Sequence, residues 1–260
     1  MGHKRLGILP QSRKWRQVVE ELRLGADIDT IAASAADAAE ASLQGAARDP
    51  AFLHAFWLLT QIPLAARGPA FADDLRRLGL QVPDRPSLMD MIAAYSGAVA
   101  RHVREQGGRT DLGEMAQMAA VESLTAAVTP TLPSLFGAAP EDVQRAVGRY
   151  ASGDGFAVLA RAFFARLTQR SLDYYLSREL ANHIGAGERF ADDGARARFD
   201  AALERHCREA SWIVEDFAGG WYGKNVYQRD GLTPDDVRRF APIAFKKVRA
   251  ELGKRRDGAA

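Results

Sequence analysis

The chain has 260 residues, of which 35 are Lys or Arg and 33 are Asp or Glu, so its formal net charge is only +2. Its single cysteine, Cys207, excludes an intramolecular disulfide framework. The longest strongly apolar stretch, Ala51 to Ile62, is well short of the roughly 20 residues that span a bilayer, and the N-terminal segment lacks the pattern of a secretion signal. We therefore expect a cytoplasmic protein that does not enter a membrane.

The small net charge conceals an uneven distribution, because residues 1–23 carry +4, residues 24–237 carry −8 and residues 238–260 carry +6. If the two ends lie close in space, as chain termini often do, they would form one cationic surface for nucleic-acid phosphates or an acidic partner. Arginine supplies 29 of the 35 basic residues and alanine 47 residues in all, a pairing that fits GC-rich coding. The few lysines are therefore more informative than the arginines.

Apolar residues recur at intervals of three and four along the chain, and no run of alternating β-branched residues occurs, which predicts an all-α fold. We expect a single array of roughly nine to eleven helices. In the first half, helices are predicted over residues 12–22, 30–43, 87–105 and 112–128, and Asp29 is expected to cap the second of them. A further helix is predicted to start at Asp49-Pro50 and to be interrupted at Pro63, and another is predicted to start at Pro140.

Phe156 to Ile184 is the longest periodic stretch and predicts a long central helix. The next helix is predicted over Arg196 to Phe217 and is expected to end at Gly219-Gly220. Thr233-Pro234 followed by two aspartates is a strong helix start, and this last helix is predicted to reach Leu252 before a frayed tail. We expect residues 1–260 to form one helical domain, with Ser152 to Gly155 as the place of any subdivision into 1–151 and 152–260.

A polar group on two consecutive predicted helices is the first candidate site. Glu179 and His183 are four residues apart, and His206 and Glu209 are three apart, so each pair shares a helix face. Two antiparallel helices could bring both pairs to one divalent metal, which would give a metal-dependent enzyme acting on an anionic substrate. The spacings differ from the Glu-x-x-His pattern of carboxylate metal sites, so surface ion pairs are the favoured interpretation. Cys207 is expected to be a buried thiol rather than a nucleophile, because adjacent helical residues point about 100° apart.

The second candidate is a compact aromatic, glycine-rich loop that contains Trp221, Tyr222, Lys224 and Asn225. Its glycines would free backbone amides, its aromatic rings would offer stacking faces, and Lys224 is the one lysine between Lys14 and Lys246. Such a loop could hold a phosphate or a base, although it lacks the spacing of a P-loop. The competing and favoured interpretation is a helix end with Trp221 and Tyr222 folded onto the core.

These observations favour a non-catalytic helical interaction subunit of a larger assembly. We expect it to bind a protein partner, with a nucleic acid as the other option, through the glycine-rich loop and through Lys246, Lys247 and Arg249 of the last helix. No cofactor is expected on this hypothesis, and a divalent metal belongs to the enzyme alternative alone. The isolated His54 and His102 are interpreted as structural residues.

Overall fold

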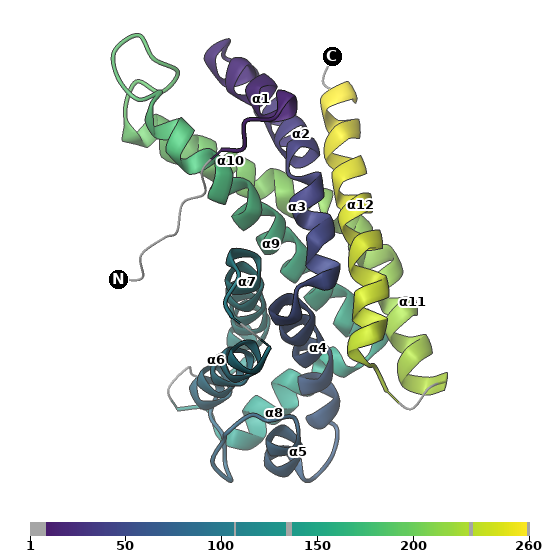
Figure 1. The fold of residues 1–260 in the computed structure, drawn as a ribbon. Coiled ribbons are helices and arrows are strands. Elements are labelled where there is room, and N and C mark those ends of the chain that lie inside the picture. The colour runs from purple at the N-terminus through teal and green to yellow at the C-terminus, as the bar shows by residue number, and fades with distance from the viewer. Residues whose placement is uncertain (1–8, 107, 134–136, 229–230, 259–260) are drawn as a thin grey trace.

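In the computed structural model, residues 9–106, 108–133, 137–228 and 231–258 are described. Residues 1–8 of the basic N-terminal segment and residues 259–260 of the predicted tail lie outside this range. Within it the regular structure is helical apart from one isolated β-bridge between Ile184 and Phe190, which confirms the predicted all-α array (Figure 1).

The described residues of the first half form eight α-helices, most of which start at or near the residues that the sequence indicates. They are α1 (Arg13–Arg23), α2 (Ile28–Ala38), α3 (Glu40–Gly45), α4 (Pro50–Ala65), α5 (Phe71–Arg77), α6 (Leu88–Glu105), α7 (Asp111–Val128) and α8 (Pro140–Gly148). The Ser12 side chain caps α1, and Ser87 and Asp90 form a capping box at the start of α6. Because caps act within one turn, these starts depend on local sequence alone.

Three features of this half differ from the predictions. The single helix predicted over residues 30–43 is divided at Ala39 into α2 and α3. Asp27, not Asp29, caps α2 by accepting a hydrogen bond from the Thr30 amide at 2.7 Å. Helix α4 also runs through Pro63 instead of stopping there. Pro63 lies in the last turn and is buried together with Ile62, so apolar burial offsets the loss of one backbone hydrogen bond.

The second half contains the long helices α9 (Gly153–Ala181), α10 (Asp193–Ala210), α11 (Trp212–Gln228) and α12 (Pro234–Gly258). Helix α9 has 29 residues and packs against α7, α10 and α11, which confirms the predicted long central helix (Figure 1). Ser152 caps it, so the predicted break at this point is the start of α9.

The single helix predicted over Arg196 to Phe217 is wrong, because the chain changes from α10 to α11 at Ser211. The Ser211 hydroxyl donates a hydrogen bond to the Cys207 carbonyl at 2.8 Å, within the preceding turn. A serine that bonds back in this way competes with the helix ladder and bends the chain. The last helix also differs from its prediction, since α12 continues past Gly253 to Gly258.

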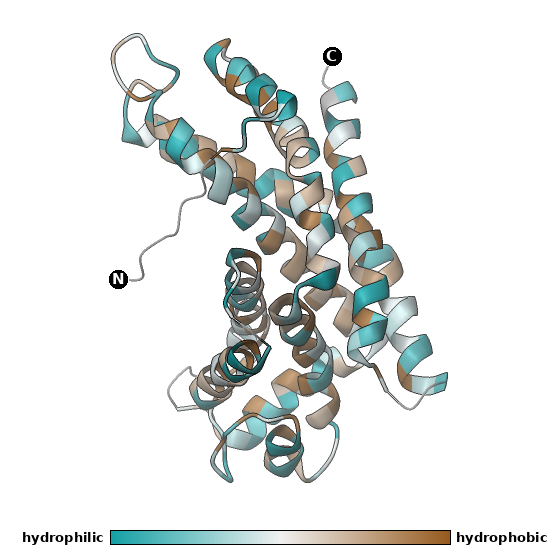
Figure 2. Ribbon diagram, in the orientation of Figure 1, coloured by the Kyte–Doolittle hydropathy of each residue, from teal (hydrophilic) through white to brown (hydrophobic). Residues whose placement is uncertain are grey.

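The centre of the molecule is an aromatic cluster around Phe56 of α4. Its ring lies 4.8 Å from the ring of Phe163, 5.3 Å from Phe164 and 5.9 Å from Phe240, measured between centroids. Figure 2 shows brown, apolar segments on the sides of the helices that face one another. Burial of these large rings is a major source of stabilisation for the array.

Candidate functional site

The predicted glycine-rich loop is a helix, which corrects the most specific structural prediction for this region. Trp221, Tyr222, Lys224 and Asn225 all lie inside α11, and Gly219 does not end it. A Cβ atom added to Gly219 would lie 3.0 Å from the carbonyl oxygen of Gly153, and one added to Gly153 would lie 2.9 Å from the carbonyl of Gly219. These two glycines let α9 and α11 approach closely, and the α11 amides are not free to cradle a phosphate.

The aromatic residues of this stretch pack inward, as the structural interpretation expects. The Tyr222 ring stacks on Phe156 with centroids 4.2 Å apart, and its hydroxyl donates to the Thr60 carbonyl at 3.2 Å. The Trp221 ring stacks on Phe240 at 4.2 Å. The side-chain amide of Asn225 donates a hydrogen bond to the Trp221 carbonyl at 2.7 Å, within the same helix.

A groove lies between α11 and α12, directly beside these residues. It has a volume of about 270 Å³ and is lined by Phe217, Trp221, Lys224, Asn225, Asp236, Arg239, Phe240 and Ile243. Three aromatic residues, Phe217, Trp221 and Phe240, contribute to the lining, and the residue Ile243 is 51% exposed. The Asp236 carboxylate in this groove already has partners, because it accepts a hydrogen bond from the Thr233 amide at the start of α12 and pairs with Arg239 at 2.7 Å.

Lys224 lines this groove, and two further lysines, Lys246 and Lys247, follow its lining residue Ile243 on α12. In the part of the chain that the structure describes, Lys224, Lys246 and Lys247 have no carboxylate oxygen within 4.0 Å. The Lys247 ammonium lies 5.2 Å from the centroid of Phe217, a groove residue, and Lys246 is exposed three residues after Ile243. We call Lys224, Lys246, Lys247, Ile243 and the groove the α11–α12 face.

Arg249 does not belong to this face, although the sequence groups it with Lys246 and Lys247. Its guanidinium pairs with Glu40 and lies 3.8 Å from Asp37. Lys14 of α1 also approaches Glu40, at 3.6 Å. Helix α2 contacts both α1 and α12 (Figure 1), so the acidic groups of the α2–α3 segment stand between the two basic ends.

The four predicted metal ligands do not form one cluster, because only Glu179 and His183 contact each other, whereas His206 and Glu209 have other partners. His183 contacts its neighbours Glu179 at 3.2 Å and Glu188 at 3.6 Å. His206 pairs with Asp29 at 2.8 Å, and Glu209 accepts from Arg255 at 2.6 Å. Over the described ranges, no three His, Cys, Asp or Glu side chains are grouped so that they could hold a metal ion.

Asp29 is a partner of His206 that the sequence did not indicate, because 177 positions separate the two residues. The contact joins Nδ1 of the imidazole to the Asp29 carboxylate, and the buried Nε2 makes no hydrogen bond within the described chain. Burial lowers the pKa of His206, and the carboxylate of Asp29 opposes that effect. Burial also raises the pKa of Cys207, so its thiol stays protonated, as expected for a structural cysteine.

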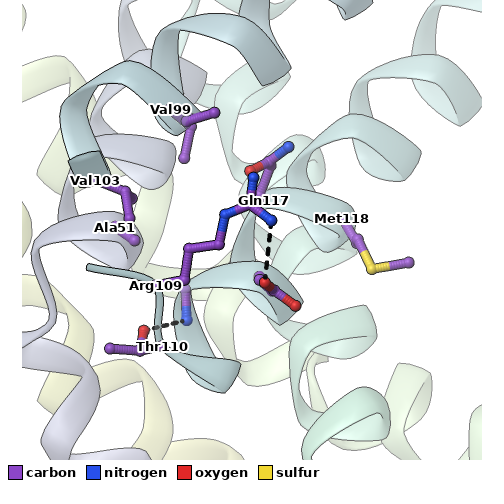
Figure 3. A pocket seen from close by; sticks show the side chains of 10 residues that line it. Ala51, Val99, Val103, Arg109, Thr110, Gln117 and Met118 are labelled. Atoms are coloured by element: carbon purple, nitrogen blue, oxygen red, sulfur yellow. Dashed lines mark hydrogen bonds and ion pairs between the residues drawn. The ribbon is translucent and has the colours of Figure 1, made fainter. Parts of the chain in front are cut away.

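A second hollow of about 260 Å³ lies between α4, α6 and α7 (Figure 3). Val99, Val103 and Ala51 form its apolar wall, and the Arg109 side chain extends into it toward Gln117. Arg109 and Glu114 face each other there at 3.9 Å. The opposite charges nearly cancel, so this hollow favours neither anions nor cations.

No helix in the described residues is long and apolar enough to cross a membrane. Comparisons with protein-family models, with curated proteins and with solved structures found no match to this chain.

Proposed function

We propose that the protein is a non-catalytic helical interaction subunit whose α11–α12 face binds an acidic segment of a partner protein. The observation that carries this proposal is the set of three lysines, Lys224, Lys246 and Lys247, that lack carboxylate partners around one groove. Elsewhere many exposed cations are paired, as Lys254 is with Glu251 at 2.6 Å. Unpaired charge beside an apolar groove attracts an oppositely charged partner and steers its approach.

The groove adds a requirement for an apolar side chain in the partner segment. Phe217, Trp221 and Phe240 line it, and Ile243 projects beside them. Protein interfaces combine an aromatic or aliphatic centre with a polar rim, and a few residues at the centre supply most of the binding energy.

A protein segment fits this face better than a nucleic acid does. Bases bind proteins by stacking on free aromatic faces, but the Trp221 ring is already stacked on Phe240 at 4.2 Å. A nucleic acid is therefore the alternative that the following experiment must exclude.

Binding can be measured by fluorescence anisotropy with three labelled probes. The first is a short Glu-rich peptide with one central Leu, the second is the same peptide with Gly in place of Leu, and the third is a single-stranded oligonucleotide of equal charge. We expect the Leu peptide to bind most tightly and more weakly as salt rises. Replacing Lys246→Glu and Lys247→Glu together should weaken binding about tenfold or more, because each reversal removes an attraction and adds a repulsion.

Arg13→Glu with Arg16→Glu is the matched control, since both residues are exposed on α1 and the net charge changes equally. This control should retain most of the affinity. Equal weakening by both double variants would contradict a defined α11–α12 site. Tighter binding of the oligonucleotide, weakened by the same lysine changes, would replace the protein partner with a nucleic acid.

A further inference from the structure

A separate groove runs between α9 and α10, on residues that the proposed function does not use. It has a volume of about 190 Å³ and is lined by Val158, Arg161, Ala162, Ala165, Arg166, Gln169, Glu204 and Arg208. Val158 and the two alanines give it an apolar strip, and three arginines border that strip. The lining thus combines a small apolar surface with an excess of positive charge.

Arg161 is held in place before any ligand arrives. Its guanidinium lies 3.0 Å from the Glu215 carboxylate and stands over the Trp212 ring, 3.0 Å from the ring centroid. The Arg161 side chain is only 17% exposed. A guanidinium fixed on two sides loses little entropy when it binds a further carboxylate.

Arg166 is fixed in a similar way and is less fully neutralised. It donates a hydrogen bond to the Ala162 carbonyl at 3.2 Å, and its Nε lies 4.0 Å from Glu122. Glu122 makes its closer ion pair with Arg170, so it neutralises Arg166 incompletely. Burial lowers the pKa of Arg166, because removal from water disfavours the charged guanidinium, and Glu122 and Glu204 oppose this effect.

Arg208 completes the set from α10. In the described chain it has no carboxylate within 4.0 Å, and it is exposed at the groove. Glu204 is the one acidic lining residue, which leaves the lining with a net charge of +2. The Glu204 carboxylate would repel an anionic ligand, so its replacement by Gln should strengthen binding.

We infer that the α9–α10 groove is a binding site for a small organic carboxylate with a short aliphatic chain. The planar guanidinium groups of Arg161, Arg166 and Arg208 match a carboxylate by forked hydrogen bonding. The strip of Val158, Ala162 and Ala165 would cover the aliphatic chain. The volume lies below the usual range for drug-sized ligands, about 300–1,000 Å³, so the ligand is small.

The probe for this site is pentanoate, compared with 1-pentanol and inorganic phosphate, each titrated into the full chain. NMR signals of the Trp212 indole and of the arginine Nε–H groups report binding directly, with assignment by Trp212→Phe. We expect saturable shifts with pentanoate and affinities at least about tenfold weaker for the other two compounds. 1-Pentanol lacks the carboxylate that the arginines bind, and phosphate lacks the aliphatic chain that the apolar strip covers.

Variants test which residues bind the probe. Arg208→Gln should weaken pentanoate binding about tenfold, since Arg208 has no competing carboxylate, and Glu204→Gln should strengthen it several-fold. Arg205→Gln is the matched control, because Arg205 is exposed on the same helix and does not line the groove. Thermal unfolding of each variant checks that the fold is intact.

Four results would each overturn the inference. They are the absence of saturable shifts, equal binding of pentanol, equal binding of phosphate, and equal weakening by Arg205→Gln and Arg208→Gln. All of these measurements leave Lys246, Lys247 and Ile243 unchanged, so their outcome is independent of the α11–α12 face.

Discussion

At the scale of single residues, two histidines that appear isolated in sequence form a pair. The rings of His54 on α4 and His102 on α6 stack with centroids 4.1 Å apart and planes at 12°. Burial, together with the nearby His102 and Arg101, lowers the pKa of His54 from 6.5 to about 4. The folded protein therefore favours neutral His54, which agrees with a structural role for this residue.

This lowered pKa predicts a loss of stability in acid. Between pH 6.5 and about 4 the unfolded chain binds a proton at His54 that the folded chain does not, so the free energy of unfolding falls as pH falls through this window. We expect His54 to lower the free energy of unfolding by on the order of 1–3 kcal/mol across this window. Partial exposure of His54 to solvent limits the size of this loss. Urea denaturation at pH 7 and at pH 4.5 measures the difference.

The variant His54→Phe keeps an aromatic ring but cannot bind a proton, so its stability should fall less between the two pH values. Some loss should remain, because burial also lowers the pKa of His206 and acts in the same direction. A loss as large in His54→Phe as in the wild type would show that His54 does not carry the effect.

At the scale of elements, neighbouring glycines of α11 have opposite surroundings. Gly219 faces α9, where an added Cβ would meet the Gly153 carbonyl oxygen at 3.0 Å and the Ala157 Cβ at 3.5 Å. An added Cβ at Gly220 would have no atom within 4 Å. One glycine therefore serves helix packing, and the other is an exposed glycine inside a helix.

This difference predicts opposite effects of the same substitution. Gly219→Ala should destabilise the protein by about 1–3 kcal/mol, because the two helix backbones must separate. Gly220→Ala should stabilise it by about 1 kcal/mol, since alanine favours the helical conformation. Urea denaturation of both variants gives the comparison. Destabilisation by Gly220→Ala would contradict a continuous α11 and support a loop.

At the scale of the whole molecule, Phe56 joins the two parts into which the sequence could be divided. Phe56 lies in 1–151, whereas the rings of Phe163 and Phe240 that it contacts lie in 152–260. Trp57 of the first part also donates its indole hydrogen to the Leu232 carbonyl at 2.8 Å. A core shared in this way favours cooperative unfolding, and the organisation as one domain stays a prediction.

Phe56→Ala provides a test of that prediction. The loss of this buried ring should cost about 3–5 kcal/mol. If the chain is one domain, far-UV and near-UV circular dichroism should still report one coincident transition at a lower denaturant concentration. Two separated transitions, or a fragment of residues 152–260 that keeps its native spectrum, would support two domains instead.

The amino-acid sequence by itself determined the helical class, the long α9 and most of the helix starts. The caps Ser87 and Thr233 were predictable because a cap bonds to an amide only two or three residues away. The inward packing of Trp221 and Tyr222 was also expected from the sequence, and both rings stack on buried phenylalanines.

Only the tertiary structure decided what the glycines of α11 do and which cations remain unpaired. Gly219 resembles a helix terminator in sequence, and its role depends on Gly153, which is 66 positions away. Arg249 resembles Lys246 and Lys247 in sequence, yet Glu40 pairs with it across the helix interface. Helix caps depend on residues within one turn, whereas close helix crossings and ion pairs depend on residues that are distant in sequence. The candidate sites are formed by contacts between such distant residues.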